Sequence, residues 1–485
     1  MDLKGLPGGQ YKPLSDKDIQ TVHEAALAIL EKTGFTYESG LDDTLAMLEA
    51  AGAQVDRSAG RIRFPRQVVL DHICKAPRKV VLCSRTGKDD LDLIEDRVYL
   101  GTGGAAIRVI DLETGEYRPT TLKDLYLLAR LVDKLDHIHF FLRPCIPTDI
   151  PEAAYDVNMF YACLKGTGKH VMSGVNNIEG FHKVLDLAST VAGGREKLIE
   201  KPFISIITSF AISPLKLCTA STRIMQEANR HRIPVALSCA PMAGSTAPIT
   251  MAANLAQIHA EQLAGIVICQ LTQPGAPLLY GGIPGRANLN TMGYLGGSVE
   301  CGMMNAAIHQ MARHIGVPNY NSSALTDSKI PDEQAAWEKG MTTLLAAMGG
   351  SNFVHHAAGM IESMIAVAYE QYVMDDEIIG MSCKALKGIE VDAEHLALEV
   401  IDAVGPGGNF MTHAHTLKHM RTEYFNGNGV TDRRSRAKWE QDGRLNARER
   451  ARRIAKKILA APEVSYLPQG VESALRQKYS EIISL

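Results

Sequence analysis

The segment FISIITSFAISPLKLCTASTRIMQEANRHRIPVALS, residues 203–238, decides the fold class. It begins and ends with short apolar, β-branched runs, 203–209 and 234–238, of the kind that form buried strands. Between them, residues 217–232 form a helical stretch. A strand, a helix and a second strand in this order predict a parallel sheet covered by helices.

The same unit repeats in both directions along the chain. Further helical stretches at 122–135, 250–264 and 299–316 alternate with short β-type runs. Eight runs result, at residues 139–143, 170–173, 203–209, 234–238, 266–270, 278–281, 318–320 and 352–356. Eight such units over about 250 residues predict an α/β protein of the TIM (β/α)8 barrel type.

The region before the predicted barrel is expected to form a helical cap and a β-hairpin. Ser15 and Asp18 have the spacing of a capping box, which predicts a helix start, and Gly34 predicts its end. More helices are expected near 41–51 and 65–75, and 98–121 reads as a hairpin with Thr114 and Gly115 in its turn. We therefore expect three regions: the cap and hairpin at 1–121, the barrel at 122–385 and a mainly helical C-terminal extension at 386–485.

Composition excludes several classes of function. The chain has 485 residues, with 51 Lys and Arg against 54 Asp and Glu, so its formal net charge is −3 and nucleic acid is not an expected partner. No apolar run reaches 18 residues and no signal-type apolar core follows Met1, so a soluble, cytoplasmic protein is expected. Its nine cysteines contain no CxxC pair and are expected to be reduced thiols.

Two striking stretches are given ordinary interpretations. GTGGAA at 101–106 lies in the predicted hairpin rather than between a strand and a helix, which disfavours a dinucleotide-binding loop. The charged run at 433–453 is interpreted as a solvated helical face.

Catalytic groups of such barrels lie at the carboxyl ends of the strands, and this position selects the candidates. His231 and His314 precede strands and are therefore set aside. The candidates that remain are Arg143, Ser173, Asn176, Ser209, Phe210, Cys239, Gln270, Tyr280, Arg286, Tyr320, Asn321, Asp327, His355 and His356.

Aromatic residues lie at several predicted strand ends in a chain that is only 6% aromatic: Phe210, Tyr280, Tyr320 and Phe353. Ring faces can bind a quaternary ammonium, which offers no hydrogen-bond donor. The alternative is that these rings fill the core.

Two histidines, His355 and His356, end the eighth run. Because side chains alternate along an extended strand, only one of them is expected to point into the barrel. That histidine either donates a hydrogen bond to a substrate carboxylate or has a purely structural role. Arg143 and Arg286 are the other donors near strand ends.

His413, His415 and His419 superficially suggest a metal site, since His415 and His419 are four residues apart. However, the stretch contains no HExxH pattern and lies outside the predicted βα units. We expect no tightly bound metal.

Several segments together resemble one family, the trimethylamine methyltransferase family of corrinoid-dependent methyltransferases. They are HEAALAILEKTGF (23–35), GRIRFPRQVVLDHICKAP (60–77), GTGGAA (101–106), TDSKIPDEQAAWEK (326–339), VGPGGNFMTHAHTLKHMRTEYF (404–425) and DRRSRAKWEQDG (432–443). The resemblance covers about residues 15–450 and implies a TIM barrel. It also implies methyl transfer from an amine to the cobalt of cobalamin, the corrinoid that a separate partner protein carries, and a homo-oligomer.

One departure from the family concerns the substrate. Founding members carry pyrrolysine near the segment that here reads TDSKIPDEQ (326–334), whereas this chain contains only the twenty standard residues. The resemblance therefore implies a relative of the glycine betaine methyltransferases. A quaternary nitrogen is already a leaving group, so cobalt(I) can take its methyl group by in-line displacement without a general acid, and the protein has to position the reactants.

These inferences combine into one expected site. The trimethylammonium group is expected among Tyr280, Tyr320 and Phe353, and the carboxylate at His355 or His356. The predicted substrate-binding set is completed by Arg286, which could instead contact the corrinoid, and by Phe210 and Asn321. Three alternatives stay open: another betaine (proline betaine, carnitine or butyrobetaine), a zinc-dependent corrinoid methyltransferase, and a non-catalytic betaine-binding barrel.

Overall fold

The computed structural model describes residues 5–485 as a mixed α/β protein built on a nine-stranded sheet. All neighbours in the sheet are parallel except the first pair, in which β1 is antiparallel to β7. The strand order is β1 (Leu6–Pro7), β7 (Arg97–Thr102), β21 (Phe353–Ala358), β20 (Asn319–Ser322), β17 (Leu278–Gly282), β15 (Val235–Leu237), β12 (Ile204–Thr208), β11 (Val171–Ser173) and β10 (Phe141–Leu142).

The strands at the two ends of the parallel run, β7 and β10, also lie next to each other. A parallel bridge joins Gly101 to Phe140. The backbone N–H of His139 donates to the carbonyl of Leu100 at 2.8 Å. Both contacts therefore link the first and last parallel strands directly.

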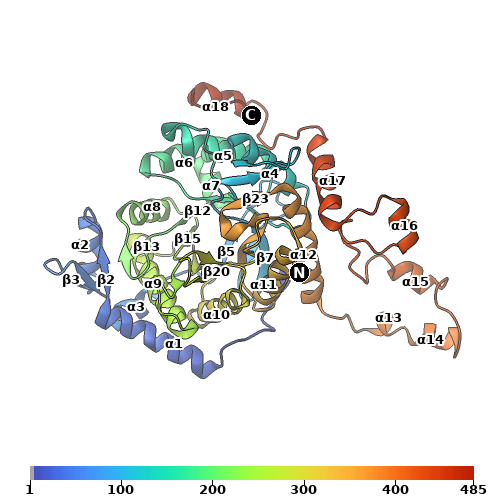
Figure 1. Cartoon of the computed structure of the whole chain (residues 1–485). Coiled ribbons are helices and arrows are strands. Elements are labelled where there is room, and N and C mark those ends of the chain that lie inside the picture. The colour runs from blue at the N-terminus through green and yellow to red at the C-terminus, as the bar shows by residue number, and fades with distance from the viewer. Residues whose placement is uncertain (1–4) are drawn as a thin grey trace.

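A helix follows each of the eight parallel strands and lies around the sheet (Figure 1). In chain order these helices are α4 (Leu122–Asp133), α5 (Tyr155–Gly166), α6 (Ile178–Ala192), α8 (Thr219–Arg230), α9 (Met251–Thr272), α10 (Val299–Ile315), α11 (Glu333–Met348) and α12 (Tyr369–Lys387). A short helix, α7 (Arg195–Glu200), and a 3-10 turn, η2 (Glu152–Ala154), accompany them. The strand–helix repeat predicted from the sequence is confirmed.

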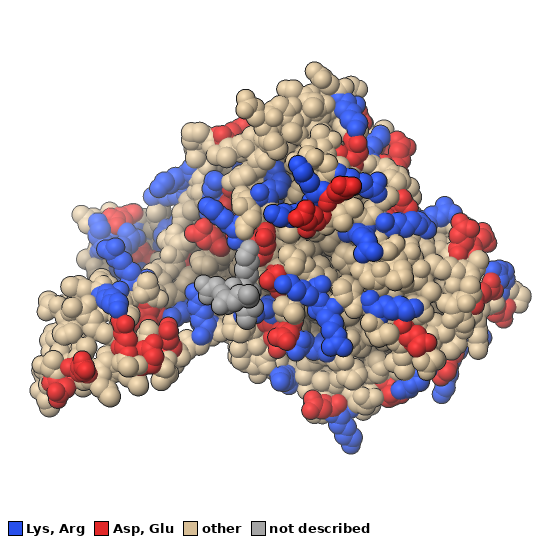
Figure 2. Space-filling model, turned by 180° about the vertical axis from the view of Figure 1, so that it is seen from behind, with Lys and Arg blue, Asp and Glu red and all other residues tan. Residues whose placement is uncertain are grey.

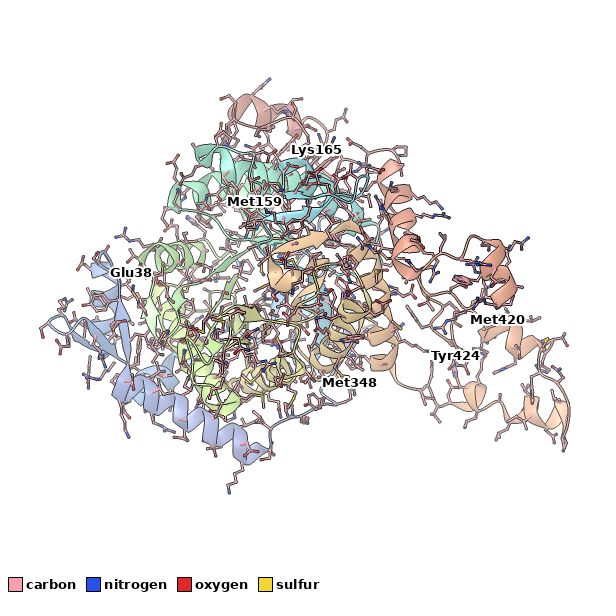
Figure 3. All side chains as sticks on the ribbon, viewed as in Figure 1. Glu38, Met159, Lys165, Met348, Met420 and Tyr424 are labelled. Carbon is pink, nitrogen blue, oxygen red and sulfur yellow. The ribbon has the colours of Figure 1, made fainter. Side chains whose placement is uncertain are left out.

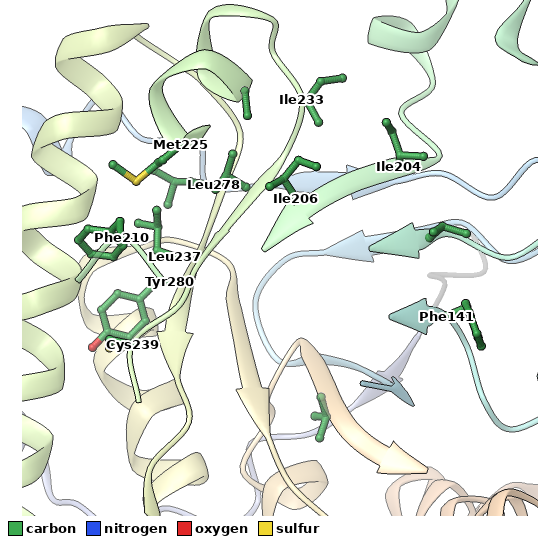
Figure 4. Close-up of a cluster of buried hydrophobic side chains, with 14 of the residues drawn as sticks. Phe141, Ile204, Ile206, Phe210, Met225, Ile233, Leu237, Cys239, Leu278 and Tyr280 are labelled. Atoms are coloured by element: carbon green, nitrogen blue, oxygen red, sulfur yellow. The ribbon is translucent and has the colours of Figure 1, made fainter. Parts of the chain in front are cut away.

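Alternate residues of the strands face two different apolar layers. On β17, Leu278 and Tyr280 belong to the large layer between sheet and helices, which we call the outer face, whereas Leu279 belongs to a separate cluster on the opposite, inner face. Figure 4 shows part of the outer layer. The inner cluster includes a residue from each of the eight parallel strands and four from a hairpin of β5 (Val80–Leu82) and β6 (Leu91–Leu93).

Seven of the eight predicted strands are strands, and the prediction for 266–270 is wrong. Those residues lie inside α9, which is buried along most of its length. A continuous apolar run does not distinguish a buried helix from a buried strand. The missing parallel strand is β7, which the sequence analysis placed in the hairpin; the hairpin itself is β8 (Arg108–Ile110) with β9 (Tyr117–Pro119).

The N-terminal helices form where they were predicted. Ser15 and Asp18 make both hydrogen bonds of the capping box at the start of α1 (Asp16–Ala28), and the π-helical turn η1 (Ile29–Thr33) ends at Gly34, which has φ +65°. α2 (Asp42–Ala50) and α3 (Arg66–Ile73) follow. A small sheet of β2 (Phe35–Tyr37), β3 (Gln54–Asp56), β4 (Arg61–Arg63), β13 (Ala211–Ile212) and β14 (Lys216–Leu217) joins this region to the loop after β12.

Two further sheets lie in the loops at the carboxyl ends of the parallel strands. One contains β16 (Met242–Ala243), β18 (Gly285–Ala287) and β19 (Tyr294–Leu295). The other pairs β8 and β9 with β22 (Met360–Ile361) and β23 (Ala366–Ala368), next to the turn η3 (Glu362–Met364). These loops lie at the end of the sheet where catalytic groups were expected.

The C-terminal region is mainly helical, as predicted. It contains α13 (Ala393–Leu396), α14 (Leu398–Val404), α15 (Ala414–His419), α16 (Arg436–Gln441), α17 (Ala447–Ala460) and α18 (Val471–Lys478). α17 contacts α12 and α4, whereas α13 and α14 project from the body (Figure 1). Within residues 5–485, no helix combines the length and the hydropathy required to cross a bilayer. On the face seen in Figure 2, acidic and basic side chains are interspersed.

Candidate active site at the carboxyl ends of the strands

His355 and His356 lie together at the end of β21. The pairing of β21 with β7 shifts register between Val354 and Ala358, and His356 has φ +63°. This irregularity breaks the alternation expected for an extended strand, and the two ring centroids are 4.1 Å apart. The structure therefore brings both rings together, whereas the sequence analysis expected only one to point inward.

The two histidines differ in their partners. His356 Nδ1 lies 2.7 Å from Oγ of Ser322, which shares a face of β20 with Tyr320. The ring of His355 lies 5.3 Å from that of Tyr320, centroid to centroid. Both ring nitrogens of His355 and the hydroxyl of Tyr320 are buried and have no hydrogen-bond partner among residues 5–485.

Unpaired buried polar atoms are costly, at about 1–3 kcal/mol each, and need an explanation. Here three of them lie on two side chains in ring contact, at the carboxyl ends of neighbouring strands. Such a group of unpaired atoms is suited to bind a polar ligand group. We therefore take Tyr320, His355 and His356 as the centre of the candidate site.

Burial sets the protonation states of this group. It lowers the pKa of His355 well below the usual value, with a smaller contribution from His356. Burial lowers the pKa of His356 to about 3, and the Lys339 ammonium adds to this effect. Burial raises the pKa of Tyr320 well above its usual value. At neutral pH the site thus offers two neutral imidazoles and a protonated phenol, all able to donate hydrogen bonds without carrying charge.

A fully buried ion pair supports the loops that follow β20 and β21. Lys339 Nζ lies 3.1 Å from a carboxylate oxygen of Asp375 and donates to the carbonyl of Ala324. The same carboxylate accepts from the backbone N–H of Gly359 at 2.7 Å. Ala324 and Gly359 both have positive φ, so this pair fixes two bent segments next to the site.

Glycine at the end of β7 allows the backbone to approach the histidines. A Cβ atom at Gly103 would lie 3.0 Å from the backbone nitrogen of His356 and 3.1 Å from the side chain of His355. These distances are tighter than ordinary van der Waals contact. The GTGGAA segment is therefore a close-packing element of this site.

A second group of polar atoms follows β10 and β11. Nη1 of the partly buried Arg143 lies 3.5 Å from Sδ of Met159, which Figure 3 labels on α5, and Ser173 Oγ lies 3.6 Å from the same sulfur. Arg143 Nε and the Tyr155 hydroxyl are buried without a hydrogen-bond partner in the described chain. The sequence analysis named Arg143 and Ser173 but missed Tyr155, because a tyrosine at the start of a helix carries no functional signal.

Three predicted substrate residues face the helices instead. Tyr280 and Phe210 belong to the outer layer (Figure 4), where the Tyr280 hydroxyl lies 2.8 Å from Nδ1 of His259. Asn321 donates to the carbonyl of Asn305 and to Ser351 Oγ, both at 2.6 Å. The structure does not bring these residues to the inner face, since each alternates with an inner-face neighbour on its strand or follows its end.

Phe353 and Arg286 take other positions. Phe353 lies on the inner face, but Phe140 stacks on its ring with centroids 3.6 Å apart. Arg286 is exposed on β18 and lines a separate cavity of about 240 Å³ with Pro284 and Glu300. The predicted three-ring cage of Tyr280, Tyr320 and Phe353 is thus not assembled, and Tyr320 is its member at the candidate site.

The remaining candidates have structural environments. Burial raises the pKa of the Cys239 thiol well above its usual value, which leaves it protonated and unreactive. Gln270 lies within α9. Asp327 accepts a hydrogen bond from the backbone N–H of Gly296 at 3.1 Å.

Comparison with known proteins identifies the family. The family described as "Trimethylamine methyltransferase (MTTB)" matches residues 6–481. The chain belongs to this family. The resemblance inferred from sequence motifs is therefore confirmed, and this trimethylamine methyltransferase family member is a methyltransferase.

Relatives within the family carry two different substrate names. "Trimethylamine methyltransferase MttB" of Desulfitobacterium hafniense (strain DSM 10664 / DCB-2) is 36% identical over 96% of this chain and 93% of its own length. "Glycine betaine methyltransferase" of D. hafniense (strain Y51) is 30% identical over 98% and 97%. "Trimethylamine methyltransferase MttB" of Methanosarcina barkeri (strain Fusaro / DSM 804) is 30% identical over 84% and 83%.

Proposed function

We propose that this family member transfers a methyl group from a quaternary amine, glycine betaine in the first place, to cobalt(I) of the corrinoid on a separate protein. The observation that carries the proposal is the group of unpaired, uncharged donors formed by His355 and Tyr320 at the carboxyl ends of β20 and β21. The full-length similarity to a protein named glycine betaine methyltransferase supports the same substrate class.

The donors favour a betaine over a simple amine. Burying a carboxylate without partners costs several kcal/mol, so a carboxylate-bearing substrate requires donors at its binding site. His355 and His356 are neutral, and Tyr320 is protonated. A betaine is a zwitterion without net charge, and therefore neutral donors can pair its carboxylate without adding charge to the buried site. Trimethylamine has no carboxylate to use them.

The cationic end requires an aromatic or apolar surface. Tyr320 offers its ring next to His355, and a desolvated cation–π contact contributes about 0.5–2 kcal/mol. Our proposal replaces the three-ring cage by Tyr320, with the stacked Phe140 and Phe353 as an apolar wall on the same face.

The chemistry requires positioning rather than acid catalysis. The C–N bond of a quaternary ammonium breaks with the electron pair staying on nitrogen, and the methyl carbon forms its new bond to cobalt. The partner's corrinoid supplies the cobalt(I) nucleophile. This chain holds the substrate in line and excludes water, which is where most of the rate advantage of an oriented reaction arises.

The surface around the candidate site fits a partner protein. Loops that follow the parallel strands carry exposed large apolar side chains, which we call the apolar rim: Ile107, Ile212, Ile249, Leu289, Met292, Ile330 and Ile365. Exposed apolar groups gathered at one end of a molecule are typical of interaction surfaces. We propose that the corrinoid protein docks on this rim.

We further propose that the sheet is a closed TIM barrel. The bridge between Gly101 and Phe140 and eight consecutive strand–helix units support this interpretation. The barrel then begins at β7, ahead of the boundary expected at residue 122.

A substrate panel tests the proposal. The purified chain and a cobalt(I) corrinoid are incubated with glycine betaine, proline betaine, carnitine, butyrobetaine, choline and trimethylamine, and methylated corrinoid is measured. We expect transfer from a betaine and none from trimethylamine. Transfer from trimethylamine alone would refute the substrate class. A betaine that binds at 100 times its Kd adds about 2.7 kcal/mol of stability; such a shift without transfer would favour the non-catalytic alternative, and loss of transfer with chelators would favour the zinc-dependent one.

A further inference from the structure

The arm at residues 388–424, which contains α13, α14 and α15, has no apolar core of its own. No residue of these three helices is buried within the described chain. Several large apolar side chains point to solvent, including Ile389 at 88% and Met411 at 74% exposed. Figure 3 shows Met420 and Tyr424 in this projecting region. A short segment without a core needs another source of stability, such as a bound metal.

The histidines of the arm behave differently from its apolar residues. His395 on α13 and His415 and His419 on α15 are all partly buried. The ring of His419 lies 5.3 Å from that of His395 and 4.5 Å from that of His415, centroid to centroid. Imidazoles thus form the contact between the first and last helices of the arm.

Potential metal ligands converge at this contact. One ring nitrogen of His395, one of His419 and one carboxylate oxygen of Glu423 all lie within 4.8 Å of one another. His395 Nδ1 lies 2.8 Å from a carboxylate oxygen of Asp392, which orients the ring and leaves Nε2 available. His419 Nε2 lies 2.9 Å from a carboxylate oxygen of Glu394, a possible fourth ligand.

The local charge favours a cation. Carboxylates of Asp392, Glu390 and Glu423 raise the pKa of His395, the hydrogen bond to Asp392 contributing most. Lys418 forms an ion pair with Glu394 and is the basic group that faces the carboxylates of this cluster in the described residues. Negative charge therefore exceeds positive charge around the three ligand atoms.

A second cluster on the body provides a contrast. His182, Glu227 and His231 also lie within ligand distance of one another. There, however, the Arg195 guanidinium contacts His231 and Arg230 lies 2.8 Å from Glu227. These guanidinium groups already neutralise the carboxylate and oppose a bound cation, so the body cluster is a suitable negative control.

We propose that the arm binds a divalent metal of the Zn²⁺ class through His395, His419 and Glu423, with Glu394 or water completing a tetrahedral shell. Zn–N and Zn–O bonds of about 2.0–2.2 Å place tetrahedral ligand atoms about 3.4 Å apart, so the three atoms must move closer together. Exposed neighbours such as Leu396 and Leu417 leave room for that movement. The ion joins α13 to α15 and takes no part in methyl transfer, and the proposal replaces the expectation that no metal is bound.

Metal content and cobalt substitution test the site. Full-length protein is loaded with Zn²⁺ or Co²⁺, desalted, and measured by mass spectrometry of the metal and by visible absorption. We expect one ion per chain and the intense d–d bands of tetrahedral Co²⁺. His395→Ala and His419→Ala should each lose at least tenfold in affinity, whereas His182→Ala, in the body cluster, should bind as the unmodified protein does.

Limited proteolysis supplies a second readout. Chelation should accelerate cleavage between residues 388 and 424 in the unmodified protein, and should have no further effect in His395→Ala. The proposal is overturned if the unmodified protein binds neither ion, if a His395→Ala/His419→Ala double variant binds as tightly, or if the His182→Ala variant loses binding instead.

Discussion

The imidazole of His355 contacts the ring of Tyr320 on the neighbouring strand, with 5.3 Å between centroids, and neither of its nitrogens has a hydrogen-bond partner in residues 5–485. The two residues meet because β20 and β21 pair in parallel, with Tyr320 opposite Phe353 and His355 two residues further along. This relationship defines what the site can bind.

Removing a histidine should weaken betaine binding. For His355→Ala we expect a ten- to hundredfold rise in Kd for glycine betaine, because a lost hydrogen bond to a charged group costs about 1.5–3 kcal/mol. His356→Ala should have the same direction of effect, through the lost contact with Ser322 and the neighbouring ring. Choline, which lacks the carboxylate, is the matched ligand and should be little affected. If both variants bind betaine unchanged, Arg143 becomes the donor to test.

Two tyrosines that the sequence treats alike should behave differently. Tyr320→Leu should weaken betaine binding by about 0.5–2 kcal/mol through loss of the ring quadrupole. Tyr280→Phe removes a hydrogen bond to His259 on the outer face, and should reduce the free energy of unfolding by about 1 kcal/mol without changing Kd. Calorimetric titration and urea unfolding measure both quantities. An affinity loss in Tyr280→Phe and none in Tyr320→Leu would reverse the assignment.

Adding one methyl group beside the histidines should reduce activity. In Gly103→Ala the new Cβ must displace the backbone of His356 or the ring of His355, so we expect a tenfold or greater fall in kcat/KM. Gly340→Ala is the control, since nothing lies within 4 Å of its added Cβ in the middle of α11. It should stabilise the helix by about 0.5–1 kcal/mol and leave kcat/KM unchanged. Equal activity in the two variants would show that the approach of Gly103 does not matter.

Stability should fall in acid because buried histidines must take up protons on unfolding. The pKa of His356 is about 3 in the folded protein and 6.5 ordinarily. Between these values the unfolded chain binds the proton and the folded chain does not, so this contribution to stability is fully present above pH 6.5 and is lost as pH falls toward 3. Its slope approaches about 1.4 kcal/mol per pH unit. Urea unfolding of His356→Gln from pH 7 to 4 should show a shallower slope by that amount; an unchanged slope would contradict a neutral His356.

Charging the apolar rim should affect the partner and spare the chemistry. Leu289→Asp and Ile365→Asp place a carboxylate on exposed positions of loops at the carboxyl ends of the strands. We expect the KM for the corrinoid protein to rise about tenfold or more, equivalent to about 1.4 kcal/mol, with kcat for free cobalt(I) cobalamin unchanged. Ile389→Asp, on the arm, is the matched exposed control and should change neither value. If it alone raises the KM, the docking surface includes the arm instead.

The sequence by itself determined the family and much of the architecture. Ordered motifs between residues 15 and 450 identified the family, alternating strand and helix patterns predicted seven of the parallel strands, and the Ser15–Asp18 capping box predicted the first helix. These features depend on local chemistry: hydrophobic period, caps and turn residues act over a few positions and can be read along the chain.

Tertiary structure alone decided which side chains meet. Tyr280 and Tyr320 are equivalent strand-end tyrosines in sequence, but a one-residue difference in register sends a side chain to the opposite face of a sheet, and only pairing with neighbours fixes the register. The same holds for β7, whose membership in the parallel sheet depends on contacts with β21 and on the bridge to Phe140. Local pattern also could not foresee the irregular end of β21, where a positive φ at His356 brings two consecutive rings together. Such backbone conformations persist only when the surrounding fold holds them, and that fold is set by residues far apart in the chain.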